Sequence, residues 1–117
     1  MKGETIVQTV LTTIAELHDW FERNALTETE LITPINRKHT PIPGIISYPE
    51  AVEEALCYGW IDGVQRPIDG IYYTRFTPRR KNSHWSVLNI ERYRRLLALG
   101  RVTEAGKLAF QRYLESK

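Results

Sequence analysis

The sequence predicts an α+β domain, in which a small antiparallel or mixed sheet with a β-hairpin at about residues 60–76 is packed by about four helices. Two helix starts have capping-box spacing, and two runs rich in aromatic and β-branched residues flank a turn that contains glycine. Two more segments with helical spacing follow near the C-terminus. The 117 residues are expected to form one domain spanning residues 1–117, because a chain of this length can bury a single core.

The N-terminal quarter predicts a strand followed by a helix. Residues 5–10 are rich in β-branched side chains, as strands are. Thr13 and Glu16 have capping-box spacing, so a helix is expected over residues 14–23. A single helix over residues 6–21 is the alternative, since apolar residues also recur there at helical spacing.

The middle of the chain predicts a strand, a loop and a helix. Residues 30–37 favour a strand that Pro34 confines to a sheet edge or a bulge. Residues 41–44 hold two prolines and a glycine, which is typical of a loop. Ser47 and Glu50 form a second capping-box pattern, and the helix that they open should end near Tyr58.

The second half predicts the hairpin and two helices. Residues 60–66 and 71–76 are the expected strands, and residues 67–70 are the expected turn. Ser83 is the predicted N-cap of a helix from His84 to about Leu99. Thr103 is the predicted N-cap of a last helix over about residues 104–114.

The composition is that of an ordinary globular protein, with 42% hydrophobic and 26% charged residues. Cys57 is the single cysteine, so no internal disulfide can form and a reducing compartment is expected. No run approaches the roughly 18 apolar residues that span a bilayer, and the first residues lack a signal-peptide pattern. These observations predict a cytoplasmic protein without membrane insertion.

The net charge of +2 is unevenly distributed along the chain. Residues 60–101 hold nine Lys or Arg against three acidic residues, while the remainder holds seven against eleven. Such asymmetry favours an anionic partner for the second half, although a solvated helix face also collects arginines.

Four segments in order resemble the YdeI/OmpD-associated family, also called bacteriocin-protection proteins. They read SYPEAVEEALCYGWIDG from Ser47, RFTPR from Arg75, SxWSxxN from Ser83 and GRVTxAG from Gly100. The signature positions carried over are Trp60, Asp62, Gly63, Phe76, Pro78 and Asn89.

The match to that family covers about half of the chain, with two departures. The family's strand near residues 31–37 usually has a Trp-Leu core, which Thr33 and Pro34 interrupt here. Members commonly continue into a basic helical extension, whereas this sequence ends at Lys117. The resemblance implies a role in tolerance of bacteriocins and cationic antimicrobial peptides, and it supplies no catalytic residue.

A basic cluster lies just before the predicted helix start at Ser83. The helix N-terminus offers free N–H groups and a positive dipole, so that side chains and backbone donors can converge on one anion. Arg79 could supply a bidentate fork to a phosphate or carboxylate, with a structural arginine–carboxylate pair as the alternative. The candidate anion-binding residues are Arg75, Arg79, Arg80, Lys81, Ser83, His84 and Trp85.

Other chemistry finds less support in the sequence. The three histidines and Cys57 share no metal-ligand spacing, so neither a metal nor another cofactor is expected. Cys57 is expected to be a buried small side chain rather than a nucleophile. Asp62 and Asp69 fit turn positions better than a catalytic carboxylate pair, although Asp62 could instead pair with Arg75 or Arg79. The aromatic set of Trp60, Tyr72, Phe76 and Trp85 is expected in the core more than on a ligand platform.

Two functions from different classes remain open on the sequence alone. The first is a non-catalytic binding protein that holds an anionic small molecule or an acidic protein segment, with nucleic acid a weaker candidate because the net charge is modest. The second is an enzyme with a pocket around Asp62, Arg79, His84 and Trp85. In a third interpretation the Trp and Arg signature is only the scaffold of the fold.

Overall fold

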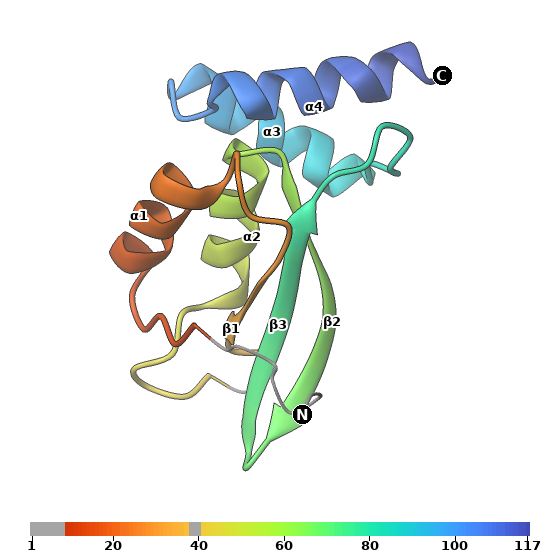
Figure 1. Ribbon diagram of the computed structural model, residues 1–117. Helices are drawn as coiled ribbons and strands as arrows, with labels where there is room; N and C mark the ends of the chain where they lie inside the picture. Colours follow the sequence, from red (N-terminus) through yellow and green to blue (C-terminus); the bar gives the residue numbers. More distant parts are fainter. Residues whose placement is uncertain (1–8, 38–40) are drawn as a thin grey trace.

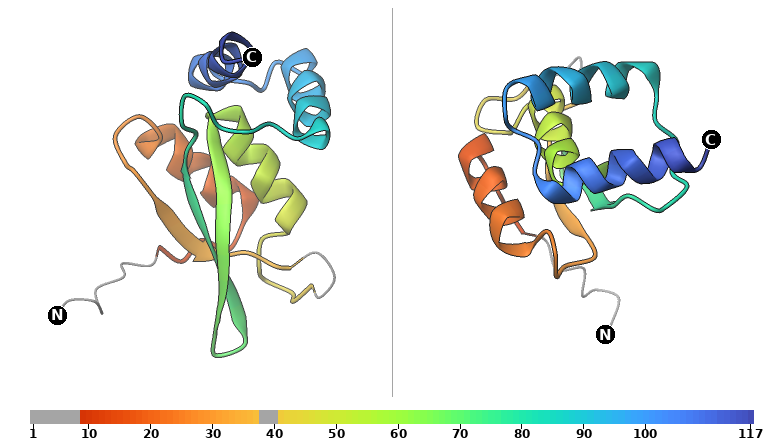
Figure 2. Two further views of the ribbon diagram at one scale, coloured as in Figure 1. Left: turned by 90° about the vertical axis from the view of Figure 1, so that its right-hand side faces the viewer. Right: turned by 90° about the horizontal axis from the view of Figure 1, so that it is seen from above.

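The computed structural model describes residues 9–37 and 41–117, and it shows the predicted α+β architecture. The elements follow in the order α1 (Ile14–Asn24), β1 (Leu31–Pro34), α2 (Tyr48–Cys57), β2 (Trp60–Ile68), β3 (Ile71–Pro78), α3 (Val87–Ala98) and α4 (Glu104–Glu115). Helices α1 and α2 lie side by side along the sheet, and α3 and α4 lie across the end opposite the hairpin turn (Figures 1 and 2). The strand expected over residues 5–10 falls mostly outside the described residues.

The sheet has three antiparallel strands in the order β1-β3-β2, so β3 is central and Pro34 lies on an edge strand as predicted. The hairpin turn is tighter than expected, because only Asp69 and Gly70 leave the ladder, both with positive φ. Pro67 lies inside β2 rather than in the turn. An edge strand tolerates proline where its missing N–H would face away from the neighbouring strand.

The core forms where α1 and α2 cover the sheet. Phe21 contacts the rings of Trp60, Phe76 and Tyr58 at centroid distances of 5.3, 6.4 and 5.3 Å. Trp60 also donates its indole N–H to the carbonyl of Ala25, which fixes the end of α1 against β2. The prediction that the hairpin aromatics lie in the core is confirmed for Trp60 and Phe76, whose side chains are fully buried.

Of the two predicted capping boxes, the structure confirms one. Thr13 accepts the backbone N–H of Glu16, whose carboxylate in turn accepts the N–H of Thr13. At the start of α2 the reciprocal bonds are missing, because the Ser47 hydroxyl donates to the Glu50 carboxylate at 2.8 Å. Gly59 ends α2 with φ +79°, a conformation that favours glycine.

The predicted start of α3 is wrong by three residues. The N-cap is Ser86, whose hydroxyl accepts the N–H of Asn89, and the helix begins at Val87. Trp85 therefore precedes the helix and packs against Tyr93 and Phe110, at centroid distances of 5.7 and 5.1 Å. The start of α4 is as predicted, with Thr103 as its N-cap.

Candidate functional site

Arg79 is the most unusual of the predicted site residues. It follows β3, and its backbone N–H donates to the carbonyl of Gly59 at 2.8 Å, which turns the side chain inward. The guanidinium lies over the Trp85 ring at 4.0 Å from the centroid. Its Nη1 donates to the Ser83 hydroxyl and to the His84 carbonyl, both at 3.2 Å. Only 8% of the residue is exposed, so a full positive charge is almost completely removed from water.

The charge of Arg79 has no close counterion among the residues that the structure describes, where no carboxylate lies within ion-pair distance of it. Its Nε is buried and has no hydrogen-bond partner there either. Burial lowers the pKa of the Arg79 guanidinium to about 10, while the negative charge of Asp62 acts in the opposite direction. The group therefore stays charged at pH 7, stabilised by an aromatic ring and two neutral oxygens.

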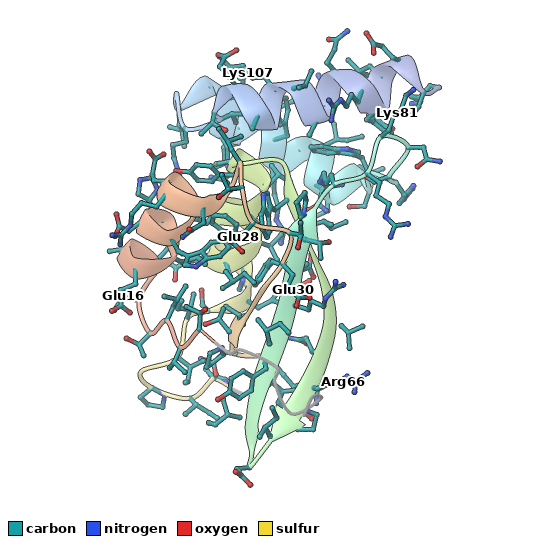
Figure 3. The ribbon with its side chains drawn as sticks, in the orientation of Figure 1. Glu16, Glu28, Glu30, Arg66, Lys81 and Lys107 are labelled. Atoms are coloured by element: carbon teal, nitrogen blue, oxygen red, sulfur yellow. The ribbon has the colours of Figure 1, made fainter. Side chains whose placement is uncertain are left out.

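The structure separates the other predicted cations from Arg79. Arg75 projects from the exposed face of β3 and pairs with Glu30 at 2.6 Å. Arg80 and Lys81 are exposed in the loop after β3, where Figure 3 shows Lys81 at the edge of the molecule, well away from Glu30. The four bases therefore do not share one environment, and Arg79 is the one that turns inward, while the binding of an anion stays a prediction.

Ser83 and His84 contact Arg79, but neither lies at the start of α3 as predicted. The Ser83 hydroxyl accepts from Arg79 rather than capping a helix. His84 contacts Arg79 through its backbone carbonyl, and the residue itself is exposed. Trp85 is 3% exposed and forms the surface on which the guanidinium stacks. Arg79, Ser83, His84 and Trp85 are thus brought together as an arginine clamp, which is the name used below for these four residues.

A second polar group lies where α2, β2 and α3 meet. Asp62 lies in β2, where it pairs with Phe76, and not in a turn as expected, and its carboxylate accepts the Tyr48 hydroxyl at 2.8 Å. Burial, followed by the hydrogen bond and charge of Asp62, raises the pKa of Tyr48 to about 12, and the charge of Arg92 opposes this shift. Arg92 also donates to Asn89 at 3.0 Å. The negative charge of Asp62 thus affects the pKa of both Tyr48 and Arg79. The sequence suggested an ion pair of Asp62 with Arg75 or Arg79, and the structure, which describes all three residues, shows neither pair.

The remaining signature residues have structural positions. Gly63 lies at a register shift between β2 and β3, where a Cβ atom would approach the Arg75 carbonyl to 3.3 Å. Pro78 pairs with Trp60 and ends β3. Tyr72, which we expected in the core, is half-buried and lies under the Arg37 guanidinium at 4.7 Å.

Sequence reasoning missed an ionic network around one buried carboxylate, that of Glu54 on α2. Glu54 is 5% exposed, and its two carboxylate oxygens lie 2.6 Å from His18 Nδ1 and 3.2 Å from Arg101 Nη2. The Tyr58 hydroxyl lies 3.4 Å from the same His18 nitrogen and donates to Glu22. Glu54 falls on the apolar face of α2 between Val52 and Ala55, and an acidic residue on such a face was the available signal.

Cys57 is a buried small side chain, as predicted, with 2% exposure. Burial raises the pKa of its thiol to about 11, which disfavours the thiolate needed for nucleophilic chemistry. Within residues 9–37 and 41–117, no three His, Cys, Asp or Glu side chains lie close enough together to hold a metal ion. No helix in the described part of the chain combines the length and apolar character that crossing a membrane requires.

Comparison with known proteins gives a family without an assigned activity. No curated protein and no solved structure matches the chain significantly. The similarity to YdeI/OmpD-associated proteins therefore stays a prediction. The family model described as a domain of unknown function, DUF8412, matches residues 9–109, and we conclude that the chain belongs to the DUF8412 family.

Proposed function

We propose that this protein is a non-catalytic binding module whose ligand carries an anionic group that the arginine clamp recognises. The observation behind the proposal is the buried Arg79 charge, which has no carboxylate partner in the described part of the chain and leaves Nε without an acceptor. Burying a charge is costly unless it is paired, and an unsatisfied buried donor often marks a missing ion or water. A carboxylate or phosphate oxygen would supply both the counterion and the acceptor.

The surroundings of the arginine clamp favour an anion and not a cation. Arg80 and Lys81 are exposed in the loop that follows Arg79 and raise the positive potential around that loop. Because Nε is buried, the atoms that cover it would have to move aside to admit an anionic oxygen at that edge of the guanidinium. The exposed side chains of Arg80 and Lys81 would then be free to turn toward the bound anion.

The alternative enzyme site is less consistent with this geometry. His84 presents a carbonyl to Arg79, and Trp85 is buried beneath the guanidinium. Asp62 is held by Tyr48. The Tyr48 hydroxyl thus occupies Asp62, and His84 contacts Arg79 through its backbone, so neither the Asp62 carboxylate nor the His84 imidazole is paired with the guanidinium for general acid–base chemistry.

The test is a calorimetric and thermal-shift titration with phosphate, sulfate, citrate, ATP and a short oligothymidylate. A ligand at about a hundredfold over its dissociation constant stabilises the folded state by roughly 2.7 kcal/mol. The comparison uses the ligand-dependent increment in melting temperature, because substitution of Arg79 alone is expected to lower stability. The oligonucleotide is titrated at two salt concentrations, since binding to phosphates weakens steeply with salt.

Two variants make the test specific. Arg79→Lys keeps a charge but loses the planar fork, so the increment for a bound anion should fall at least severalfold. Arg75→Ala removes a cation from the same strand, and the increment should be unchanged because Arg75 is paired with Glu30. Equal increments in wild type and Arg79→Lys, or no binding of any anion at millimolar concentration, would refute the proposal.

We further infer a cytoplasmic role in tolerance of bacteriocins or cationic antimicrobial peptides, as the resemblance to YdeI/OmpD-associated proteins implies. Wild-type protein expressed in a sensitive bacterium should raise survival in the presence of a cationic peptide. The Arg79→Lys variant, expressed at the same level in the cell, should not raise survival. Equal survival with wild type and empty vector would count against this role and would leave the anion titration to be judged separately.

A further inference from the structure

A cavity of about 460 Å³ lies where the end of α1 meets the start of α4, and none of the arginine clamp residues lines it. Its volume falls within the roughly 300–1,000 Å³ that is typical of small-molecule sites. Leu26 and Leu108 on its walls are 87% and 50% exposed, so apolar surface is left in contact with water. The lining residues come from α1, the end of α2 and α4: Phe21, Glu22, Ala25, Leu26, Tyr58, Thr103, Glu104, Ala105 and Leu108.

The wall formed by α4 is fixed against the end of α2. The backbone N–H and the hydroxyl of Thr103 both donate to the Cys57 carbonyl, at 2.9 and 2.7 Å. Gly106 permits this close approach, since a Cβ there would lie only 2.4 Å from the same carbonyl oxygen. A Cβ at Gly59 would lie 2.9 Å from the Ala105 carbonyl. The cavity is therefore preformed by backbone contacts, which lowers the ordering cost of binding.

The chemistry of the cavity is apolar with negative charge. Tyr58 stacks on Phe21 at 5.3 Å with nearly parallel rings, so the inner wall is aromatic. Glu22 accepts the Tyr58 hydroxyl, and no base lies within ion-pair distance of its carboxylate in residues 9–37 and 41–117. Glu104, on the α4 wall, pairs with Lys107 at 3.3 Å, and the Glu104 side chain is 91% exposed.

We propose that this cavity binds a small amphipathic cation, a molecule with an apolar body and one protonated amine. The apolar body would cover the leucines and the Phe21–Tyr58 stack, and the ammonium would lie near Glu22 and Glu104. Ammonium groups are also attracted to the face of an aromatic ring. An anionic ligand would meet two carboxylates instead, and a neutral one would leave Glu22 without a counterion. This ligand class is distinct from the anion assigned to the arginine clamp.

The test uses three eight-carbon probes whose head groups are cationic, neutral and anionic: octylamine, octanol and octanoate. NMR titration at pH 7 follows the backbone amides of Ala25 and Ala105, which line the cavity, and gives the dissociation constants. We expect octylamine to bind about fivefold more tightly than octanol, which is the upper range for an exposed ion pair, and octanoate to bind most weakly.

The variants separate charge from shape. Glu22→Gln with Glu104→Gln should abolish the preference for octylamine over octanol, while the amide of Gln at position 22 can still accept from Tyr58. Glu91→Gln, an exposed change on α3, should leave the preference intact. Leu108→Ser removes apolar surface from the cavity wall and should weaken the binding of all three probes. The inference is wrong if octylamine binds no more tightly than octanol, if the preference survives the double substitution, or if the shifted amides lie away from the cavity.

Discussion

Gly106→Ala tests the contact on which the placement of α4 depends. The new Cβ would lie 2.4 Å from the Cys57 carbonyl oxygen, 2.9 Å from its carbon and 2.8 Å from Val102 Cγ1. Two of these atoms belong to the backbone, so a side-chain rotation cannot relieve the overlap. Moving α4 away would also stretch the two hydrogen bonds from Thr103 to the same carbonyl.

The expected result is a clear loss of stability in a helix where alanine would otherwise help. Overpacking at such a site costs about 3 kcal/mol, and replacing glycine by alanine in a helix returns about 1 kcal/mol. The net loss of about 2 kcal/mol corresponds to a fall of roughly 8 °C in melting temperature for a domain of this size.

Urea unfolding followed by tryptophan fluorescence measures this loss, because three tryptophans report on the core and on the α3–α4 region. Gln111→Ala is the matched control in the same helix, and its free energy of unfolding should lie within about 0.5 kcal/mol of wild type. If Gly106→Ala is as stable as wild type, α4 does not approach α2 as closely as the structure shows. The cavity beside α4 would then have a different shape.

Three further predictions concern the helix start, the buried thiol and the ionic network. Ser86→Ala should lower the free energy of unfolding by about 1 kcal/mol through loss of the cap, and Ser83→Ala should leave the helicity measured by circular dichroism unchanged. Burial raises the pKa of Cys57 to about 11, so its contribution to stability is fully present below about pH 9 and is lost as the pH rises to 11. Unfolding titrations of wild type and Cys57→Ala should therefore converge over that range, and parallel curves would contradict the assignment. Glu54→Gln should cost about 2 kcal/mol, because it removes the charge shared with His18 and Arg101, and an unfolding titration that shows no loss would count against the network.

The fold could be predicted from the sequence wherever a local pattern had one interpretation. The Thr13–Glu16 box and the Gly70 turn are short-range signals, and the structure contains both. Ser83 was the predicted cap, but its hydroxyl accepts a hydrogen bond from Arg79, and the hydroxyl of Ser86 caps α3 instead. Ser47 failed as a cap for a similar reason, since its hydroxyl donates to Glu50.

The candidate site was harder to predict, because bases that are neighbours in the sequence occupy different environments. Alternation along β3 places Arg75 on the exposed face, opposite in direction to the buried Thr74 and Phe76. Beyond Pro78 the ladder ends, and alternation no longer decides where Arg79 points. The direction of the Arg79 side chain depends instead on two contacts. One is the hydrogen bond from its N–H to the carbonyl of Gly59, twenty residues earlier, and the other is the ring of Trp85, six residues later.

A count of basic residues therefore overstates how many can act together on one ligand. Arg75 is neutralised by Glu30, and Arg80 and Lys81 are already solvated, so binding an anion gains little from any of them alone. Arg79 differs because most of its desolvation has already occurred before a ligand arrives. An anion that reaches this guanidinium is attracted strongly, because the surroundings have a low dielectric constant. Most of the free-energy cost of desolvating the arginine has already been met by folding. If anions bind with the same affinity to wild type and Arg79→Lys, this advantage is absent and the stacked arginine serves only to position the loop before α3.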